Sequence, residues 1–322
     1  MDSATRRGLW IVVQLAFVAA ALWFVGTALA RQWGDVRHSL EVVHPAWGLV
    51  LASGVLVLGS YALLIQTWRV MLEAWGGRLL PYWSATRIWF VSNLGKYVPG
   101  KVWQITAMSA LAQREGISPV AATGSALVIN LANLLSGFVL VLGGGLRLLD
   151  TTTGGRSGAA IAVAAVLLVG LLLLPTLLPR TAALAGRLTG RNLGIPSLPA
   201  RPIWLATLGT AVAWLLYGLA FALLARGVLP GVRGSLVDTV AVYTISYLAG
   251  YLFVPAPGGL GVREWTMVQG LTTLGLASQG DAWVIAFASR LWLTVLEVLP
   301  GVLFIFFGGL RSPPVHLHVD HT

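Results

Sequence analysis

The sequence predicts an all-α polytopic membrane protein, with six spanning helices and two Pro/Gly-broken re-entrant hairpins in an inverted repeat. Of its 322 residues, 57% are hydrophobic and 10% are charged, whereas about a quarter of the residues in a soluble domain are charged. Several stretches of about 20 residues carry almost no charge, which is the length needed to cross a hydrocarbon core roughly 30 Å thick. Two further apolar stretches are interrupted by Pro and Gly, which break a helix.

Six uninterrupted apolar stretches are the predicted spans. An even number of crossings places both termini on one side of the membrane, and Arg6, Arg7, Arg180 and Arg311 flank the spans on that side. Positively charged loops stay cytoplasmic, so both termini are expected in the cytoplasm. The spans are expected at residues 9–30, 46–68, 119–142, 159–178, 203–225 and 282–307.

The net charge of +10 does not indicate nucleic-acid binding, because the basic residues lie in loops between apolar stretches, as membrane orientation requires. The first apolar stretch is too long for a signal peptide and has no convincing small-residue cleavage site before Arg31, so a retained span is expected. The chain contains no cysteine, which excludes disulfides and thiolate metal sites.

The two interrupted stretches, residues 81–116 and 237–276, each predict a helix, an irregular hinge and a second helix. The first hinge contains Pro99 and Gly100. In a membrane, irregular backbone is tolerated only where it is buried in protein or lines a wet cavity. The two segments are therefore expected to be re-entrant hairpins beside a polar site. The second hinge contains Pro255, Pro257, Gly258, Gly259 and Gly261.

The two hairpins resemble one another in sequence. The pairs are Ser92 with Ser246, Leu94 with Leu248, Tyr97 with Tyr251, Val98 with Leu252 and Pro99 with Pro255. Counting crossings puts the hairpins on opposite sides of the membrane, so one domain is expected to contain repeat one at about 46–142, repeat two at about 203–307 and a polar tail at 308–322. Broken helices at matching places in two halves are typical of transporter binding sites. The alternative is an eight-crossing bundle with proline kinks and no symmetry.

Both lysines of the chain lie in the first hinge. Of the 21 Lys and Arg residues, only Lys96 and Lys101 are lysines, and they flank a four-residue Tyr-Val-Pro-Gly turn that follows Asn93. An ammonium group is a point charge suited to phosphate, and helix ends at a hinge offer further backbone donors. We predict that Lys96, Lys101, Asn93 and Tyr97 bind a lipid phosphate; the alternative is that both lysines snorkel to the interface.

Other charged residues at membrane depth are candidates for the same site. Arg263 and Glu264 follow the second hinge, where Glu264 also suits the first turn of a helix. Arg290, Thr294 and Glu297 share one helical face that should point inward, because charges in the bilayer are costly. A buried ion pair is the structural alternative for this face. Asn130, Asn133 and Gly137 share a face of the third span, and Arg69 and Arg87 are candidates for recruiting anionic headgroups.

Enzyme and cofactor motifs are absent from the sequence. There is no HExxH, phosphate-binding GKS or GKT, or GxSxG pattern. The His-containing tail from His316 to His321 is expected to be disordered rather than to bind metal. We therefore expect no enzyme activity, no cofactor and no metal, and rank a membrane-embedded transferase using Glu264 and Glu297 last.

Two segments carry a resemblance to a known family. GKYVPGKVWQ, residues 95–104, and PAPGGLGVRE, residues 255–264, resemble the signature segments of the lysylphosphatidylglycerol synthase/flippase transmembrane-domain family, over roughly residues 8–310. In fuller members, a soluble domain transfers lysine or alanine to phosphatidylglycerol and the membrane domain flips the product outward. That soluble domain is missing from this sequence, so the resemblance implies a stand-alone flippase-like protein.

The expected function is transport of an anionic phospholipid or a polyprenyl-phosphate-linked glycolipid across the cytoplasmic membrane of a bacterium, by alternating access about the two hinges. The alternative is a non-transporting, lipid-binding scaffold for a separate glycosyltransferase or lipid synthase. Expected partners are the lipid substrate, membrane lipids and such an enzyme, with no nucleic acid. A homo-oligomer is compatible with either hypothesis.

Overall fold

The computed structural model describes residues 45–76, 78–97, 102–144, 200–229, 231–232, 234–253 and 256–308, with isolated positions between 27 and 38 and between 165 and 184. Every element in these ranges is helical. The expected spans at 9–30 and 159–178 lie outside the described residues apart from those isolated positions, as does the tail after residue 308. Pro99, Gly100, Lys101 and Pro255 also lie outside them.

Four helices are long and apolar enough to cross a membrane. They are α3 (Trp47–Gly76), α6 (Pro119–Gly144), α9 (Ala200–Val228) and α12 (Gln279–Gly308), and they match four of the six expected spans. The end of α3 was expected at residue 68, before the charged Arg69, but the helix continues to Gly76. The guanidinium of Arg69 is satisfied locally because its Nε and Nη2 donate to the carbonyl oxygen of Leu80 at 2.9 and 2.7 Å.

The two interrupted stretches fold as helix, turn and helix, as the Pro and Gly residues predicted. The first comprises α4 (Tyr82–Asn93), the 3₁₀ turn η1 (Leu94–Tyr97) and α5 (Val102–Arg114). The second comprises α10 (Leu236–Leu252), the 3₁₀ turn η2 (Pro257–Gly259) and α11 (Val262–Thr273). The described chain thus repeats one order of elements twice: a long helix, a broken pair of short helices and a second long helix.

Serine side chains mark where several of these helices begin. The hydroxyl of Ser118 accepts from the backbone N–H of Ala121 before α6, and that of Ser235 accepts from Asp238 before α10, at 3.2 and 3.1 Å. Ser278 caps α12 in the same way through Asp281. Such caps satisfy N–H groups that the first helical turn leaves unpaired, and each stabilises a helix by about 1 kcal/mol.

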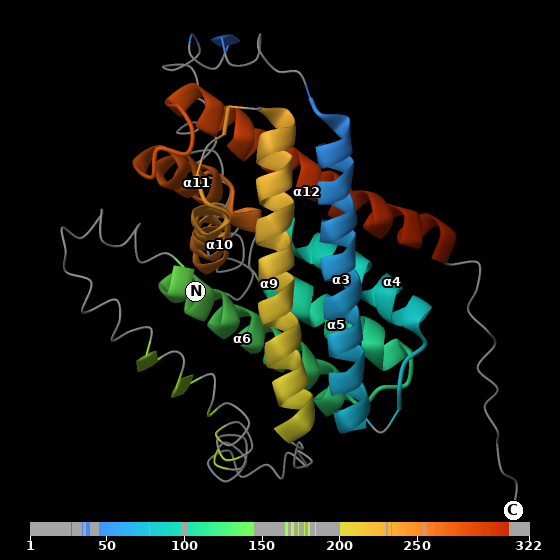
Figure 1. The fold of residues 1–322 in the computed structure, drawn as a ribbon. Coiled ribbons are helices and arrows are strands. Elements are labelled where there is room, and N and C mark those ends of the chain that lie inside the picture. The colour runs from blue at the N-terminus through green and yellow to red at the C-terminus, as the bar shows by residue number, and fades with distance from the viewer. Residues whose placement is uncertain are drawn as a thin grey trace, which may run out of the picture.

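The first helices of the two units pack against each other in opposite directions. Figure 1 shows α3 and α9 side by side, with the start of α3 beside the end of α9. The backbone N–H of Ala46 donates to the carbonyl oxygen of Gly227 at 2.8 Å. A Cβ atom on Gly209 of α9 would lie 2.4 Å from the hydroxyl of Thr67 on α3, so only glycine permits this close approach.

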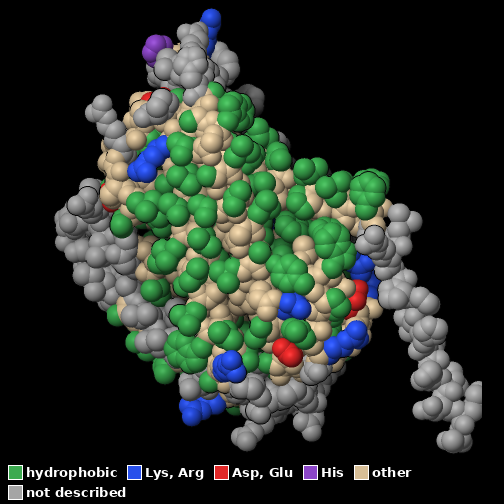
Figure 2. All heavy atoms as spheres, turned by 45° about the vertical axis from the view of Figure 1, so that its right-hand side comes forward, with side chains coloured by type: hydrophobic (Ala, Val, Ile, Leu, Met, Phe, Trp, Pro, Cys, Tyr) green, Lys and Arg blue, Asp and Glu red, His purple; other side chains and the backbone are tan. Residues whose placement is uncertain are grey.

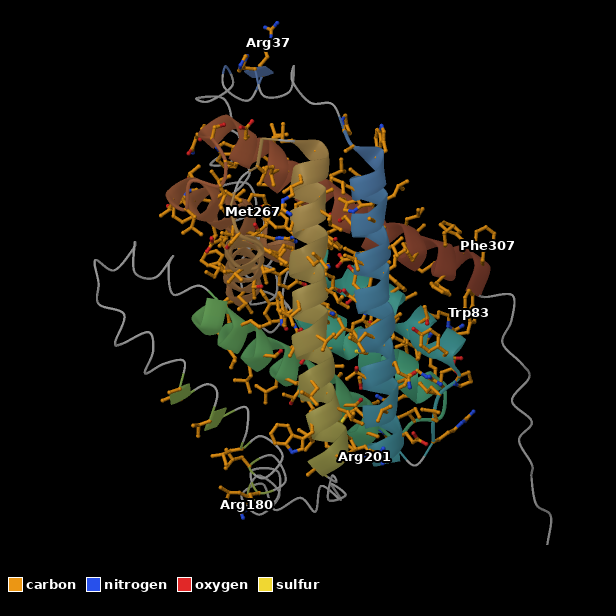
Figure 3. All side chains as sticks on the ribbon, viewed as in Figure 1. Arg37, Trp83, Arg180, Arg201, Met267 and Phe307 are labelled. Atoms are coloured by element: carbon orange, nitrogen blue, oxygen red, sulfur yellow. The ribbon has the colours of Figure 1, made fainter. Side chains whose placement is uncertain are left out.

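The exterior is apolar and the polar groups gather inside or at the ends. Large hydrophobic side chains cover the middle of the face in Figure 2, while charged ones gather mainly toward its lower end. Arg201, at the start of α9, lies at the same end of the molecule as Arg180 (Figure 3). An apolar belt with charged ends is the surface that a bilayer requires. The exposed apolar residues include Val55, Leu127, Leu208, Leu291 and Phe306.

Candidate functional site

A polar cavity lies where the two broken segments meet. The turns η1 and η2 contact each other, and α3, α6, α9 and α12 complete the walls. The cavity encloses about 1330 Å³ of space between atoms, including its open mouth. Its lining residues are Tyr61, Leu64, Trp89, Asn93, Lys96, Tyr97, Gln104, Met108, Ile129, Asn130, Asn133, Trp214, Tyr217, Tyr243, Tyr247, Gly250, Tyr251, Gly258, Gly259, Arg263, Arg290, Leu293, Thr294 and Glu297.

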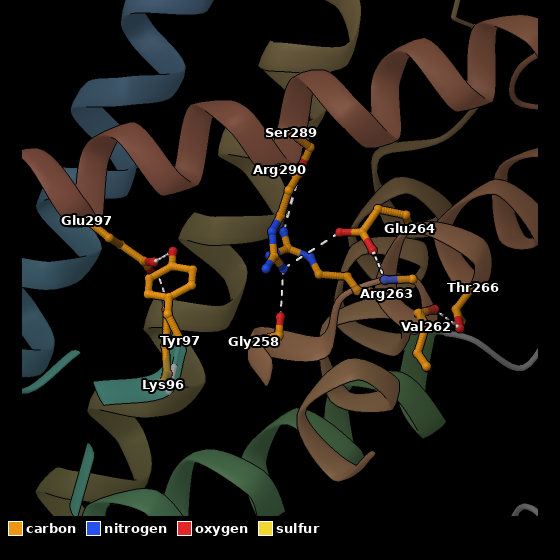
Figure 4. Close-up of polar contacts among 11 residues, drawn as sticks. Lys96, Tyr97, Gly258, Val262, Arg263, Glu264, Thr266, Ser289, Arg290 and Glu297 are labelled. Carbon is orange, nitrogen blue, oxygen red and sulfur yellow. Dashed lines mark hydrogen bonds and ion pairs between the residues drawn. The ribbon is translucent and has the colours of Figure 1, made fainter. Parts of the chain in front are cut away.

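One end of the cavity is organised around Glu297 of α12. Its carboxylate forms an ion pair with Lys96 of η1 and accepts hydrogen bonds from Tyr61 of α3 at 2.5 Å and from Tyr97 of η1 at 3.1 Å. Figure 4 shows Lys96 and Tyr97 converging on this carboxylate. Glu297 is only 6% exposed. A buried carboxylate requires such partners, because leaving it unpaired costs several kcal/mol.

The other end of the cavity is organised around two arginines. Nη1 of Arg290 donates to the carbonyl oxygen of Gly258 at 2.6 Å and lies 3.6 Å from the carboxylate of Glu264. Glu264 in turn accepts from the backbone N–H of Gly261 at 2.7 Å, at the start of α11. Arg290 therefore ties the second hinge to α12 (Figure 4), and Glu264 both caps α11 and balances part of the charge of Arg290.

Arg263 is held differently from the other cations of the cavity. Its guanidinium lies over the rings of Tyr243 and Tyr247, at 5.6 and 5.1 Å from their centroids, and reaches only the hydroxyl of Ser289 at 3.5 Å. The residue is 7% exposed. Among the described residues, no carboxylate pairs with Arg263, although it is nine-tenths buried. A buried guanidinium that faces a cavity without a counter-ion is suited to bind an anion.

Uncharged polar groups occupy the wall between these ends. The amide oxygen of Asn130 on α6 accepts a hydrogen bond from the hydroxyl of Tyr251 on α10 at 3.2 Å. Gln104 donates to the amide oxygen of Asn93, which joins α5 to the end of α4. The cavity therefore presents amide and hydroxyl groups beside its charges. Among the described lining residues, three cations and one carboxylate give an excess of positive charge.

Most of the predicted site residues meet in this cavity. Asn93, Lys96 and Tyr97 come from the first hinge region, and Arg263 follows the second. Arg290, Thr294 and Glu297 line the cavity together, as their helical spacing predicted, and so do Asn130 and Asn133. Glu264 lies behind the lining, paired with Arg290. The hinge glycines Gly258, Gly259 and Gly261 have positive φ angles of 57, 72 and 82°.

Two predicted anion-recruiting residues lie elsewhere. Arg69 does not line the cavity; besides Leu80, it contacts the ring of Tyr82 at 5.2 Å. Arg87 forms an ion pair of 2.7 Å with Glu115. Arg69 thus contacts the start of α4, and Arg87 joins α4 to the end of α5. Each charge therefore has a structural role.

Sequence reasoning missed most of the aromatic lining. Tyr61, Tyr217, Tyr243, Tyr247, Trp89 and Trp214 border the cavity but were not singled out. A signal for part of this set was present, since Tyr243, Tyr247 and Tyr251 follow one another at intervals of four and therefore share a face of α10. The tyrosines on α3 and α9 carry no comparable local pattern.

The chain matches the family model described as the lysylphosphatidylglycerol synthase TM region, over residues 11–301. No curated protein matches it closely enough to count as a relative. The matched region contains nearly the whole of the four described long helices, both broken segments and every residue that lines the cavity. The chain is thus a member of the lysylphosphatidylglycerol synthase TM-region family.

Proposed function

We propose that this protein carries an anionic lipid across the membrane, with the headgroup in the cavity and the acyl or prenyl chains outside it. The observation that supports this proposal best is Arg263, a buried cation that faces the cavity with no carboxylate beside it among the described residues. Phosphate is the anion common to the candidate lipids, and a guanidinium can bind it through two hydrogen bonds. Lys96 supplies a second positive charge. To bind it, the phosphate must compete with the carboxylate of Glu297.

An inverted repeat would provide the movement. The two units share their order of elements, their first helices run in opposite directions, and matched serines make the same contact. Ser92 donates to the carbonyl oxygen of Trp89 and Ser246 to that of Tyr243, at 3.0 and 2.8 Å. In transporters built from such repeats, one unit rocks against the other around a central site. We infer that η1 and η2 are the hinges of this motion.

The proposed topology has six spans and two re-entrant hairpins, with both termini on the cytoplasmic side of a bacterial inner membrane. It predicts that α5 and α11 end on opposite sides. The natural chain has no cysteine, so single cysteines can be introduced at the exposed residues Gln113 and Thr273. In intact cells, an impermeant maleimide should label Thr273→Cys but reach Gln113→Cys only after permeabilisation. Labelling of both from the same side would contradict the inverted arrangement.

Transport fits the cavity better than group-transfer chemistry. Glu264 and Glu297 are the buried carboxylates near the site, and each already accepts hydrogen bonds and pairs with a cation. The carboxylate of Glu297 is engaged by Lys96, Tyr61 and Tyr97. Ion pairing of both groups favours a binding and positioning role over general acid or base work.

Purified protein in liposomes tests the proposal directly. We expect the wild type to move fluorescent phosphatidylglycerol between leaflets without a partner protein, measured by the loss of protection from dithionite. Arg263→Gln should slow this movement about tenfold or more, because one charge-assisted hydrogen bond contributes about 1.5–3 kcal/mol. Arg87→Gln is the matched control, since it removes an arginine outside the cavity. Lipid binding without movement in the wild type would favour the scaffold function.

A further inference from the structure

The aromatic residues of the cavity differ from those elsewhere in the protein. The chain has seven tyrosines and ten phenylalanines. Six of the seven tyrosines line the cavity, with two tryptophans, whereas no phenylalanine is found among the described lining residues. Phe90, Phe221 and Phe287 pack instead against other helices in the core. The aromatic rings that face the cavity thus all carry a hydrogen-bonding group.

Packing alone does not account for these hydroxyl groups. Tyr61 and Tyr97 donate to Glu297, and Tyr251 donates to Asn130. The hydroxyls of Tyr243 and Tyr247 make no hydrogen bond with any described residue, and neither is sealed away from the cavity. A phenol at membrane depth needs a hydrogen-bond partner, which here is water or a ligand in the cavity. Phenylalanine would fill the same space, so these two hydroxyls are available to a ligand.

Amide side chains, like the tyrosines, are concentrated in the cavity lining. Three of the four asparagines in the sequence, Asn93, Asn130 and Asn133, line the cavity together with Gln104. Each amide both donates and accepts hydrogen bonds. The amides lie on α4, α5 and α6, and the amide of Asn130 is hydrogen-bonded to Tyr251 of α10. The described lining thus combines aromatic side chains with neutral donors and acceptors.

We propose that the headgroup bound here is a ring polyol, a sugar or cyclitol, joined to the lipid through phosphate; this rests on the proposed transport function. Hydroxyls of such a ring donate and accept hydrogen bonds, as the amides and phenols of the cavity do. Arg263 binds the phosphate. An ammonium headgroup is disfavoured, because the described lining has three cations and one carboxylate, which is paired with Lys96.

Competition between lipids measures this preference. Detergent-solubilised protein is mixed with equal amounts of phosphatidylinositol, phosphatidylglycerol and phosphatidylcholine, and bound lipid is counted by native mass spectrometry. We expect about tenfold more bound phosphatidylinositol than phosphatidylglycerol, the factor that two added hydrogen bonds provide, and least phosphatidylcholine. A second mixture of a polyprenyl phosphate with and without an attached hexose shows whether the same preference holds on a prenyl lipid. Equal occupancy in both mixtures would overturn the inference.

Substitutions test whether Tyr243 and Tyr247 cause the preference for a polyol headgroup. The double substitution Tyr243→Phe/Tyr247→Phe removes only two hydroxyls without described partners, so the fold should be retained and the preference for the polyol should fall to within about twofold. Tyr82→Phe is the control, because Tyr82 is the one tyrosine outside the cavity. An unchanged preference in the double variant would overturn the assignment. Transport of phosphatidylglycerol without a polyol preference would refute this inference alone, whereas preferential binding without movement would refute only the transport proposal.

Discussion

Lys96→Gln is expected to abolish lipid movement and to lower the free energy of unfolding by about 3 kcal/mol. The substitution removes the cation that pairs with Glu297, and a buried carboxylate then keeps only its tyrosine hydrogen bonds. It also removes one of the charges proposed to attract the phosphate. Thermal unfolding in detergent measures the first effect, and the liposome assay measures the second.

The double variant Lys96→Gln/Glu297→Gln separates the two roles of Lys96. Neutralising both partners removes the unpaired charge, so most of the lost stability should return, while transport should stay low because the ammonium group is absent. The expected coupling between the two positions is about 1–3 kcal/mol. Recovery of transport together with stability would show that Lys96 only neutralises Glu297, and would contradict its role in binding the lipid.

Gly259→Ala is expected to disrupt the second hinge. Gly259 has a φ of 72°, and a Cβ there would lie 2.7 Å from Cα of Gly250 in α10. Because the nearest atoms belong to the backbone, η2 must move away from α10, and Arg263 moves with the start of α11. We expect a loss of about 3 kcal/mol or more, from the left-handed backbone and the overlap together, and loss of transport.

Gly275→Ala provides the matched control for that prediction. Gly275 also has a positive φ, 64°, but a Cβ added there would meet no atom within 4 Å. The substitution therefore carries the backbone penalty alone, about 1–2 kcal/mol, and should leave transport unchanged. Equal stability losses for the two variants, measured by thermal unfolding, would show that the contact between η2 and α10 is not tightly packed.

Much of this architecture was predictable because it follows from local chemistry. Long apolar stretches predicted four described helices, and Pro and Gly residues predicted the second turn; Pro99 and Gly100 of the first hinge lie outside the described residues. The stripe of Arg290, Thr294 and Glu297 pointed inward, as the cost of charge in lipid requires. The resemblance in two short segments agreed with the family match.

The pairing inside the cavity was not predictable from sequence. Lys96 and Glu297 are 201 residues apart, and no local spacing indicates which carboxylate a hinge lysine meets. The partner of Arg69 was not predictable either. We expected Arg69 to recruit anions, but its guanidinium donates to the carbonyl oxygen of Leu80, which follows α3. Tyr61 and Tyr217 join the cavity only because α3 and α9 pack together, a contact that no single helix specifies.

The carboxylate of Glu297 also sets a condition on movement. It joins the last helix to α3 and η1 of the first unit, so the two units cannot separate there until the attachment is released. On the proposed mechanism, a phosphate that binds Lys96 would release Glu297 and so allow the two units to move apart.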